Sequence, residues 1–284
     1  MNYVIIIIGI LLLVLFIIGY HKYRKWYYLT YLKNKIFSQI NNITLTKPIN
    51  SEKYYQTMIA AAPRKLTQLE IIFLLKYKKF VDSPYTYSMS DPNKVMQTKK
   101  LVSDIISKNI EGCLIETGVW KGGMAMWMKC ILDYYREKRQ IWLFDTFEYF
   151  PKPVTNDKDI KIHGITQILF ENMPNTNDVI NNFKKFGLYD ETIHLIKGNF
   201  IDTLPNVDPG KIAILRLDCD YYEPSYYVLE LYYNKVTPGG YIIIDDYGNK
   251  HLSCKEAIND FRKKYDITSP IYDIQNESVY WIKN

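Results

Sequence analysis

Two short apolar segments in the C-terminal half of the chain each end directly at acidic residues. They are Ile212-Ala-Ile-Leu-Arg-Leu-Asp218-Cys-Asp220 and Gly240-Tyr-Ile-Ile-Ile-Asp245-Asp246. Apolar runs rich in Ile and Leu that are bounded by turn residues are typical of buried strands. In open α/β sheets, the groups that bind ligands lie just beyond the carboxyl ends of such strands. The sequence therefore predicts an α/β fold with three or four carboxylates in one crevice.

Carboxylates that lie so close together repel each other unless a cation or a shared proton offsets their charge. Mg²⁺ prefers oxygen ligands and is the simplest cation for such a crevice. This pattern indicates an enzyme with a divalent metal site.

The net charge of +6 does not indicate a nucleic-acid partner, because the excess lies at one end of the chain. Basic residues near the N-terminus precede the first acidic residue, Glu52, and account for most of these charges; among them are Lys22, Arg24, Lys25, Lys33 and Lys35. A nucleic-acid-binding protein usually concentrates its basic residues on the folded domain. We expect no nucleic-acid partner.

The N-terminus predicts a single-pass membrane anchor. The segment Tyr3–Tyr20 has no charged residue, and its 18 residues would form a helix of about 27 Å, enough to cross a bilayer core. A cleaved signal peptide would have positive charge before the apolar run and small residues after it. Here the run is followed by the basic and aromatic flank His21-Lys-Tyr-Arg-Lys25-Trp-Tyr-Tyr, which favours an anchor that is retained over residues 1–25.

Basic residues beside a membrane span usually face the cytoplasm, so we expect the catalytic domain on the cytoplasmic side of the membrane. The four cysteines agree with a reducing compartment, since their spacing matches neither a CxxC pair nor a zinc site.

The rest of the chain predicts two regions, a helical N-terminal or lid segment at residues 26–110 and the catalytic domain at 111–284. Amphipathic stretches in the first region are Glu70–Phe80 and Lys94–Lys108. Expected strands are Cys113–Glu116, Ile141–Asp145, Thr192–Ile196, Ile212–Asp218, Tyr241–Asp245 and Val279–Ile282. Expected helices are Met124–Glu137, Asp178–Phe186, Pro224–Tyr233 and Cys254–Tyr265. This alternation is typical of a mostly parallel sheet with helices on both faces. The segment Phe147–Pro174 is predicted to be an irregular active-site insertion.

A glycine-rich turn follows the first expected strand, with the sequence Glu116-Thr-Gly118-Val-Trp-Lys-Gly122-Gly123. It differs from the dinucleotide pattern GxGxxG because Trp120 stands at the second glycine position. Asp145 ends the next strand, where its carboxylate could accept both hydroxyls of a ribose. Glu116 could meet an amino group at the other end of the same ligand. S-adenosylmethionine has both features, whereas NAD has no amino-acid end.

Several blocks of sequence, in this order, resemble the macrocin O-methyltransferase (TylF/MycF-like) family over roughly residues 85–284. They are Glu116–Gly123, Asp145-Thr-Phe-Glu-Tyr-Phe-Pro151, Asp202-Thr-Leu-Pro205, Leu215-Arg-Leu-Asp-Cys-Asp-Tyr-Tyr-Glu223, Pro238-Gly-Gly240, Asp245-Asp-Tyr-Gly248 and Cys254-Lys-Glu-Ala257 with Phe261-Arg262. Together they are far more specific than any one of them.

The resemblance implies a class I methyltransferase (Rossmann-like) fold and Mg²⁺-dependent methyl transfer from S-adenosylmethionine to a hydroxyl of a sugar or glycan. It implies that the metal ligands are Asp218, Asp245 and Asp246, with Asp218 also the general base. The cofactor-binding residues would be Glu116, Gly118, Gly122 and Asp145, with Asn199 and Phe200 beside the adenine. Usual family members lack an anchor like Tyr3–Tyr20, so the acceptor is expected to be membrane-associated or polymeric. A homo-oligomer is compatible with these features.

Other polar residues near these motifs have two interpretations. Asp220 either orients Asp218 or a metal-bound water, or caps the N-terminus of the helix that follows. His251 is better interpreted as a solvated loop residue than as a proton shuttle. His163 falls in the insertion, where it could face the substrate, and His194 falls in a strand. Arg216 lies in a buried strand, so we expect it to pair with an acid.

Two other functions compete with this interpretation. Asp218-Cys-Asp220 is a DxD sequence, which a membrane-anchored glycosyltransferase would use to hold a metal and a nucleotide sugar. That interpretation leaves the glycine-rich turn, Glu116 and Asp145 unexplained. The other alternative is a non-catalytic anchored scaffold, and the intact set of expected ligands argues against it.

Overall fold

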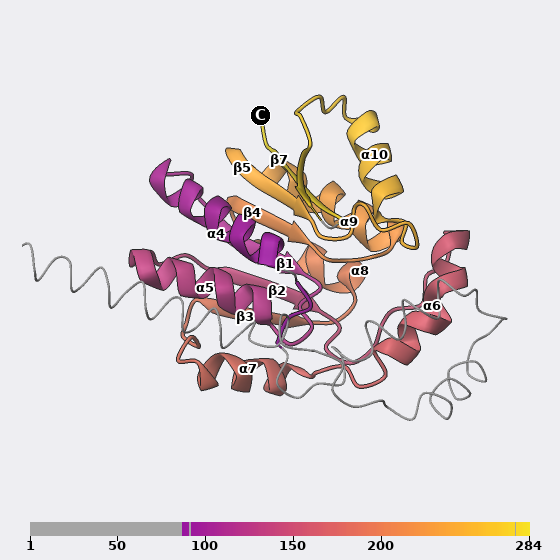
Figure 1. The fold of residues 1–284 in the computed structure, drawn as a ribbon, viewed down its shortest axis with the longest axis horizontal. Helices are drawn as coiled ribbons and strands as arrows, with labels where there is room; N and C mark the ends of the chain where they lie inside the picture. Colours follow the sequence, from indigo (N-terminus) through magenta and orange to yellow (C-terminus); the bar gives the residue numbers. More distant parts are fainter. Residues whose placement is uncertain (1–86, 91, 276) are drawn as a thin grey trace, which may run out of the picture.

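The computed structural model describes residues 87–90, 92–275 and 277–284, and these form one α/β sandwich (Figure 1). Its seven-stranded sheet has the order β3-β2-β1-β4-β5-β7-β6. The five strands from β3 to β5 are parallel to one another, β7 is antiparallel to β5, and β6 is antiparallel to β7. The prediction of a mostly parallel, Rossmann-like sheet is confirmed.

The bounds of the predicted elements stay close to the observed ones, except that the strand predicted at Tyr241–Asp245 begins already at Val236. The strands are β1 Cys113–Thr117, β2 Ile141–Asp145, β3 Ile193–Lys197, β4 Ile212–Leu217, β5 Val236–Ile244, β6 Tyr272–Gln275 and β7 Ser278–Ile282. The helices are α4 Pro92–Ser107, α5 Gly123–Tyr135, α6 Asp157–Leu169, α7 Thr176–Lys185, α8 Phe200–Thr203, α9 Tyr222–Tyr232 and α10 Cys254–Lys264.

Helices cover both faces of the sheet because the strands carry apolar side chains on both faces. On one face, α4, α5 and α7 bury side chains such as Leu101, Trp127 and Phe183 in one hydrophobic cluster. On the other, α9 and α10 pack against each other and bury Val228 and Phe261. All six residues of β4 are buried, which places the end of this central strand inside the molecule.

The expectation of an irregular insertion at residues 147–174 is wrong in part, because α6 occupies its middle. The side chain of Asn156 caps this helix by accepting hydrogen bonds from the N–H groups of Lys158 and Asp159. A glycine at position 164 and weak apolar periodicity hide the helix in the sequence. Strand β6 was also not predicted, since a four-residue edge strand leaves little periodic signal.

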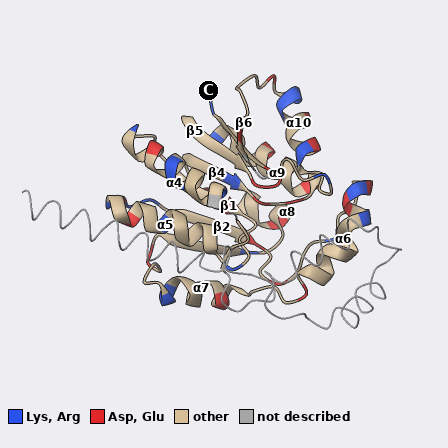
Figure 2. Ribbon diagram, viewed as in Figure 1, with Lys and Arg blue, Asp and Glu red and all other residues tan. Residues whose placement is uncertain are grey.

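The helix predicted at Lys94–Lys108 is confirmed as α4. It packs on α5 and belongs to the same hydrophobic cluster, so the boundary predicted at residue 110 separates two segments of one core. The expected membrane anchor Tyr3–Tyr20 and the stretch Glu70–Phe80 lie outside the described residues. Among the helices that are described, none is long and apolar enough to cross a membrane. Figure 2 shows acidic and basic residues interspersed along α4, α6 and α10.

Candidate active site

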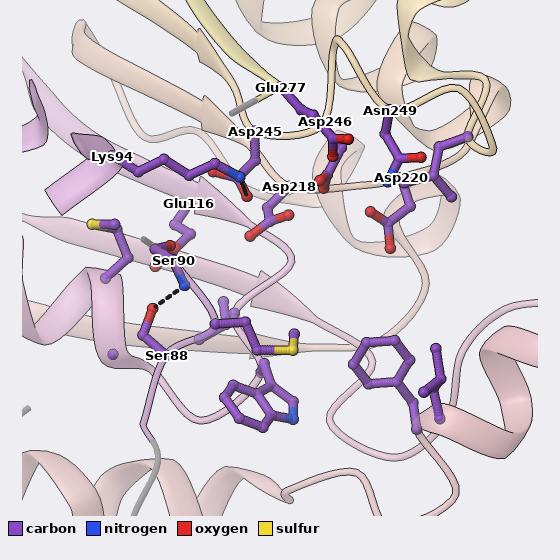
Figure 3. Close-up of a pocket in the computed structure, with 18 of the residues that line it drawn as sticks. Ser88, Ser90, Lys94, Glu116, Asp218, Asp220, Asp245, Asp246, Asn249 and Glu277 are labelled. Atoms are coloured by element: carbon purple, nitrogen blue, oxygen red, sulfur yellow. Dashed lines mark hydrogen bonds and ion pairs between the residues drawn. The ribbon is translucent and has the colours of Figure 1, made fainter. Parts of the chain in front are cut away.

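A cavity of about 510 Å³ lies at the carboxyl ends of β1, β4 and β5 (Figure 3). This volume is within the range of ordinary small-molecule sites. The acidic residues that line it are Glu116, Asp218, Asp220, Asp245 and Asp246. The acid-ended strands predicted from the sequence therefore do meet at one crevice.

Strand register brings these acids together. In the sheet, Leu217 pairs with Thr117 of β1 on one side and with Ile244 of β5 on the other. The N–H of Asp218 then donates to the carbonyl of Thr117 at 2.8 Å, and the N–H of Asp245 donates to the carbonyl of Leu217 at 2.9 Å. The next side chain of each strand thus emerges at the same level.

The guanidinium of Arg216 links three of the carboxylates. Its Nη1 donates to Glu116 Oε1 at 2.6 Å and to Asp218 Oδ2 at 3.0 Å, and its Nη2 donates to Asp245 Oδ1 at 2.6 Å. Arg216 is only 1 % exposed, so these charges interact with little screening by water. The predicted pairing of Arg216 with an acid is confirmed, and three acids share it.

A second cation, Lys94 from α4, also holds Asp245. Its Nζ lies 2.9 Å from Asp245 Oδ2 (Figure 3). Burial alone would raise the pKa of Asp245, but Arg216 and Lys94 outweigh this effect and hold the pKa below its ordinary value. Burial likewise would lower the pKa of Lys94, but the charges of Asp245, Asp246 and Asp218 raise it. Asp245 is therefore an ionised carboxylate with two internal counter-ions.

Asp218, Asp220 and Asp246, which all line the cavity, form a compact group. One carboxylate oxygen of each lies within 4.8 Å of the others. Burial and the neighbouring charges of Asp245 and Asp246 raise the pKa of Asp218 well above its ordinary value. Burial and the charges of Asp246 and Asp218 do the same for Asp220. Three oxygen donors with unbalanced charge are the donor set that a hard divalent cation prefers.

This group overlaps with the predicted metal ligands but is not identical to them. Asp218 and Asp246 belong to it, and Asp220 is its third member. Asp245 lies beside the group, bonded to Lys94 and Arg216. Its assignment as a metal ligand stays a prediction.

Asp220 does not cap the following helix, so that interpretation is wrong. The N-cap residue of α9 is Tyr221, which makes no side-chain cap, and the N–H of Tyr222 donates to Asp159 Oδ2 at 2.9 Å. Asp220 itself has a left-handed backbone with φ of 61°. Its side chain is thereby left to join Asp218 and Asp246.

Glu116 presents a buried oxygen with no hydrogen-bond partner among the described residues. Its Oε1 accepts from Arg216, while its Oε2 is the orphan, and the residue is only 2 % exposed. Burial raises the pKa of Glu116 to about 7, although Arg216 lowers it. An orphaned acceptor in a ligand-sized cavity fits a ligand that brings a cationic N–H donor, such as the amino group of S-adenosylmethionine.

The carboxylate of Asp145 accepts hydrogen bonds from the glycine-rich turn. Its Oδ2 accepts from the N–H groups of Val119 at 2.7 Å and Trp120 at 3.0 Å, and its Oδ1 accepts from the N–H of Phe147 at 2.9 Å. Asp145 does not line the cavity described above. Its predicted contact with a ribose stays a prediction, and its structural role is to fasten the turn to β2.

The glycines of the turn are required by contacts within the chain. Gly118 has φ of +84°, and a Cβ at this position would lie 1.9 Å from the carbonyl oxygen of Asp218. Gly122 is the N-cap of α5, and a Cβ there would meet the side chains of Val179 and Phe183. Only a glycine lets β1 and β4 approach so closely at position 118. Cofactor contacts by both glycines stay predictions.

Asn199 and Phe200 lie at the start of α8 and do not line the cavity. The side chain of Asn199 caps this helix by accepting from the N–H of Ile201, and Phe200 is half-buried against the second hydrophobic cluster. Their predicted position beside an adenine is untested by these contacts.

One wall of the cavity comes from α6, which agrees with placing residues 147–174 at the active site. This wall consists of Ile162, Ile165, Thr166, Leu169 and Phe170. Asp159 fastens the helix, since its Oδ2 accepts from Ser253 Oγ at 2.5 Å as well as from Tyr222. Sequence reasoning missed Lys94, whose signal was a single basic residue in an amphipathic helix.

The three histidines of the described residues make local contacts. His163 Nδ1 is 3.4 Å from the hydroxyl of Tyr221. His194 stacks on Trp142, with ring centroids 4.2 Å apart. His251 is half-buried in the loop before α10, and its N–H donates to Asn249 Oδ1. None of the three lines the described cavity.

Comparison with known proteins agrees with this geometry. The family model of Macrocin-O-methyltransferase (TylF) matches residues 27–283. Demethyldecarbamoylnovobiocin O-methyltransferase of Streptomyces niveus is 33 % identical over 69 % of this chain and 75 % of its own. A 4'-O-methyltransferase of Streptomyces olivaceus, which acts on 8-demethyl-8-(2,3-dimethoxy-alpha-L-rhamnosyl)-tetracenomycin-C, is 34 % identical over 63 % of this chain and 69 % of its own.

Among solved structures, the O-methyltransferase NovP superposes with a TM-score of 0.66 and 29 % identity, over 82 % of this chain and 99 % of NovP. The resemblance seen in the sequence blocks is thus confirmed over most of the chain. The chain belongs to the macrocin O-methyltransferase (TylF) family and is an S-adenosylmethionine-dependent O-methyltransferase.

Proposed function

We propose that this enzyme methylates a hydroxyl of a sugar or glycan and that it requires Mg²⁺. The observation that carries the proposal is that one cavity is lined both by Glu116, with its orphaned acceptor, and by the group Asp218, Asp220 and Asp246. A methyl donor and a hydroxyl acceptor need these two kinds of contact side by side. Relatives whose names include a rhamnosyl 4'-O-methyltransferase and a mycinamicin III 3''-O-methyltransferase support a sugar acceptor.

Asp218 and Asp246 would hold the metal, together with Asp220 or with the predicted ligand Asp245. When bound, Mg²⁺ supplies Lewis acidity that makes an acceptor hydroxyl easier to deprotonate. The oxygen donors of the group fit such an ion in type.

The side chains of this protein would do the remaining work. Glu116 would accept a hydrogen bond from the amino group of the cofactor and so orient its methyl group toward the acids. Asp218 would take the proton of the acceptor hydroxyl, because it follows β4 and is the member of the acid group that shares Arg216 with Glu116. The wall of α6 would exclude water from the reacting atoms. Positioning of the sulfonium methyl group in line with the hydroxyl would provide much of the rate enhancement.

Cofactor binding is the first test. Calorimetry with S-adenosylhomocysteine should show binding to the purified protein, whereas UDP-sugars should not bind. Binding of a UDP-sugar in place of S-adenosylhomocysteine would favour the glycosyltransferase alternative, which leaves Glu116 and the glycine-rich turn without a role.

Activity is the second test. Glycan and glycolipid acceptors would be screened with isotope-labelled S-adenosylmethionine in Mg²⁺ and again in EDTA. We expect labelled methyl on at least one acceptor and its loss in EDTA. Full activity in EDTA would contradict the metal requirement, and cofactor binding without transfer to any acceptor would favour the scaffold alternative.

We also propose that Tyr3–Tyr20 anchors the enzyme in a membrane with its catalytic domain in the cytoplasm. The support is the uncharged run of 18 residues and the basic flank that follows it. The full chain should stay in the membrane fraction after carbonate extraction, and a chain that begins after Lys25 should not. Protease added to intact cells should leave the catalytic domain uncut. Light scattering of the detergent-solubilised chain would test for a homo-oligomer.

A further inference from the structure

We propose that Arg216 couples the two halves of the active site, so that a divalent cation at the acids weakens binding of the amino-acid end of the cofactor. This inference rests on the proposed function, because it takes Glu116 as the contact of the cofactor amino group. It concerns a property that neither half of the site has alone, namely a linkage between them.

The geometry of Arg216 is the basis for this coupling. A single nitrogen, Nη1, donates both to Glu116 on the cofactor side and to Asp218 on the metal side, at 2.6 and 3.0 Å. Its other nitrogen, Nη2, holds Asp245 at 2.6 Å. One positive charge is thus divided among three carboxylates on three adjacent strands. A change in charge at any one of them alters how much of that charge the others receive.

Burial strengthens the effect of sharing the Arg216 charge among these carboxylates. Arg216 and Glu116 are 1 % and 2 % exposed, so water cannot offset a change in their charge balance. Lys94 adds a second positive charge at Asp245. Among the described residues, Arg216 is the side chain that bonds to both Glu116 and the acids of the metal group.

The sign of the coupling follows from the charges. A cation bound by Asp218 and its neighbours neutralises part of their negative charge, so they attract Arg216 less. The guanidinium of Arg216 then interacts more strongly with Glu116. The carboxylate of Glu116 therefore attracts an ammonium group less. Direct repulsion between the two cations acts in the same direction. Coupling between binding sites is reciprocal, so the cofactor must weaken binding of the metal by the same factor.

The test measures the Kd of S-adenosylhomocysteine by calorimetry, without metal and with saturating Mn²⁺. We expect Mn²⁺ to raise this Kd by at least about fivefold, the lower end of measured couplings between sites. The ligand control is 5′-methylthioadenosine, which keeps the nucleoside and lacks the amino-acid end. Its Kd should change by less than about twofold, because it makes no contact with Glu116. Electron paramagnetic resonance of Mn²⁺ should show the reciprocal effect.

Glu116→Gln tests the pathway in the protein. It keeps the shape of the side chain and leaves Arg216 bonded to Asp218 and Asp245, so folding is less at risk than with a change of Arg216. We expect weaker binding of S-adenosylhomocysteine and a metal effect reduced to less than about twofold. The matched control is Glu111→Gln, which removes the same charge from an exposed pair with Lys211 and should leave the coupling intact.

Each other outcome overturns the inference. Independent binding of S-adenosylhomocysteine and Mn²⁺, tighter binding of one in the presence of the other, or equal weakening of 5′-methylthioadenosine would each exclude coupling through Glu116 and Arg216. In those cases the proposed function stands, because both ligands bind. If S-adenosylhomocysteine does not bind under any condition, the proposed function fails and the inference fails with it.

Discussion

Asp145 and the group Asp218, Asp220 and Asp246 lie at the carboxyl ends of strands of the same sheet, yet their surroundings differ. Asp145 accepts three backbone N–H groups, from Val119, Trp120 and Phe147. In the group, burial and mutual repulsion raise the pKa of Asp218 and Asp220. The first carboxylate is balanced by fixed backbone donors of the fold. In the second set, Arg216 offsets only part of the repulsion through its bond to Asp218, and a bound cation would offset the rest.

The comparison teaches how two acids at equivalent positions of a sheet acquire different tasks. Backbone donors stabilise an ionised carboxylate and tie it to the turn that supplies them. A group of acids without such donors stores electrostatic repulsion, which a bound cation relieves. Loss of Asp145 should therefore damage the fold, and loss of the other acids should damage function.

The largest effect is expected for Asp218→Asn, which removes the proposed general base and proposed metal ligand. Turnover should fall by about 10²- to 10⁴-fold, as is usual when a general base is lost. The Kd of S-adenosylhomocysteine should rise far less, because the variant affects Glu116 only through the shared charge of Arg216. Asp202→Asn is the control, since Asp202 is exposed on α8. A comparable loss of cofactor affinity in Asp218→Asn would show that this acid belongs with Asp145, as a structural group.

Asp145→Ala should cause the largest loss of stability. It removes the acceptor of three buried N–H groups, and each unsatisfied donor costs about 1–3 kcal/mol. We expect the free energy of unfolding in urea to fall by about 3 kcal/mol or more. Asp178→Ala, at the exposed capping box of α7, should cost only about 1 kcal/mol. Equal losses in the two variants would remove the distinction between the acids.

Asp246→Asn should stabilise the protein in the absence of metal, in contrast to the loss of stability expected for Asp145→Ala. Besides burial, Asp246 contributes to the raised pKa of both Asp218 and Asp220, so its neutralisation relieves repulsion. We expect Tm to rise by about 2–4 °C without Mg²⁺, which corresponds to about 1 kcal/mol for a domain of this size. The stabilisation of the wild-type protein by Mg²⁺ should be lost. A lower Tm without metal would contradict unbalanced charge in this group.

A further effect concerns the pH dependence of stability at Glu116. Its pKa is about 7 in the folded protein against an ordinary value of 4.5, so the folded state retains a proton that the unfolded state loses. Stability that is present below pH 4.5 is therefore lost as the pH rises toward 7. Relative to Glu116→Gln, the wild-type protein should become less stable across this interval and change no further above it. Urea unfolding at several pH values measures the difference, and a rising relative stability of the wild type would contradict it.

The sequence predicts the frame of the site because strands leave a strong local signal. The runs at Ile212 and Tyr241 identify β4 and β5, and the acids that follow them must then lie at one edge of the sheet. The charge of Arg216 within a buried run predicts an acidic partner. These inferences need only the alternation of strands and the rule that parallel strands end at the same edge.

Other features depend on contacts that no local pattern specifies. Lys94 reaches Asp245 from 151 residues away in the sequence. Asp220 joins the acids because its backbone adopts a left-handed conformation, and the cap expected of it is supplied by Asp159 from α6. Two of the three backbone donors of Asp145, the N–H groups of Val119 and Trp120, come from the turn after another strand. Tertiary packing assigns these roles, so sequence patterns predicted the residues near the site better than their partners.

Gly118 has a consequence for how this enzyme can change by mutation. Its missing side chain is the space into which the carbonyl of Asp218 fits, so every other residue at position 118 would push the end of β4 away. A saturation library should therefore find that position 118 tolerates no other residue, and the reason is this structural role. Variation in acceptor preference has to come from elsewhere in the cavity wall, and the exchangeable side chains of α6 offer the more permissive route.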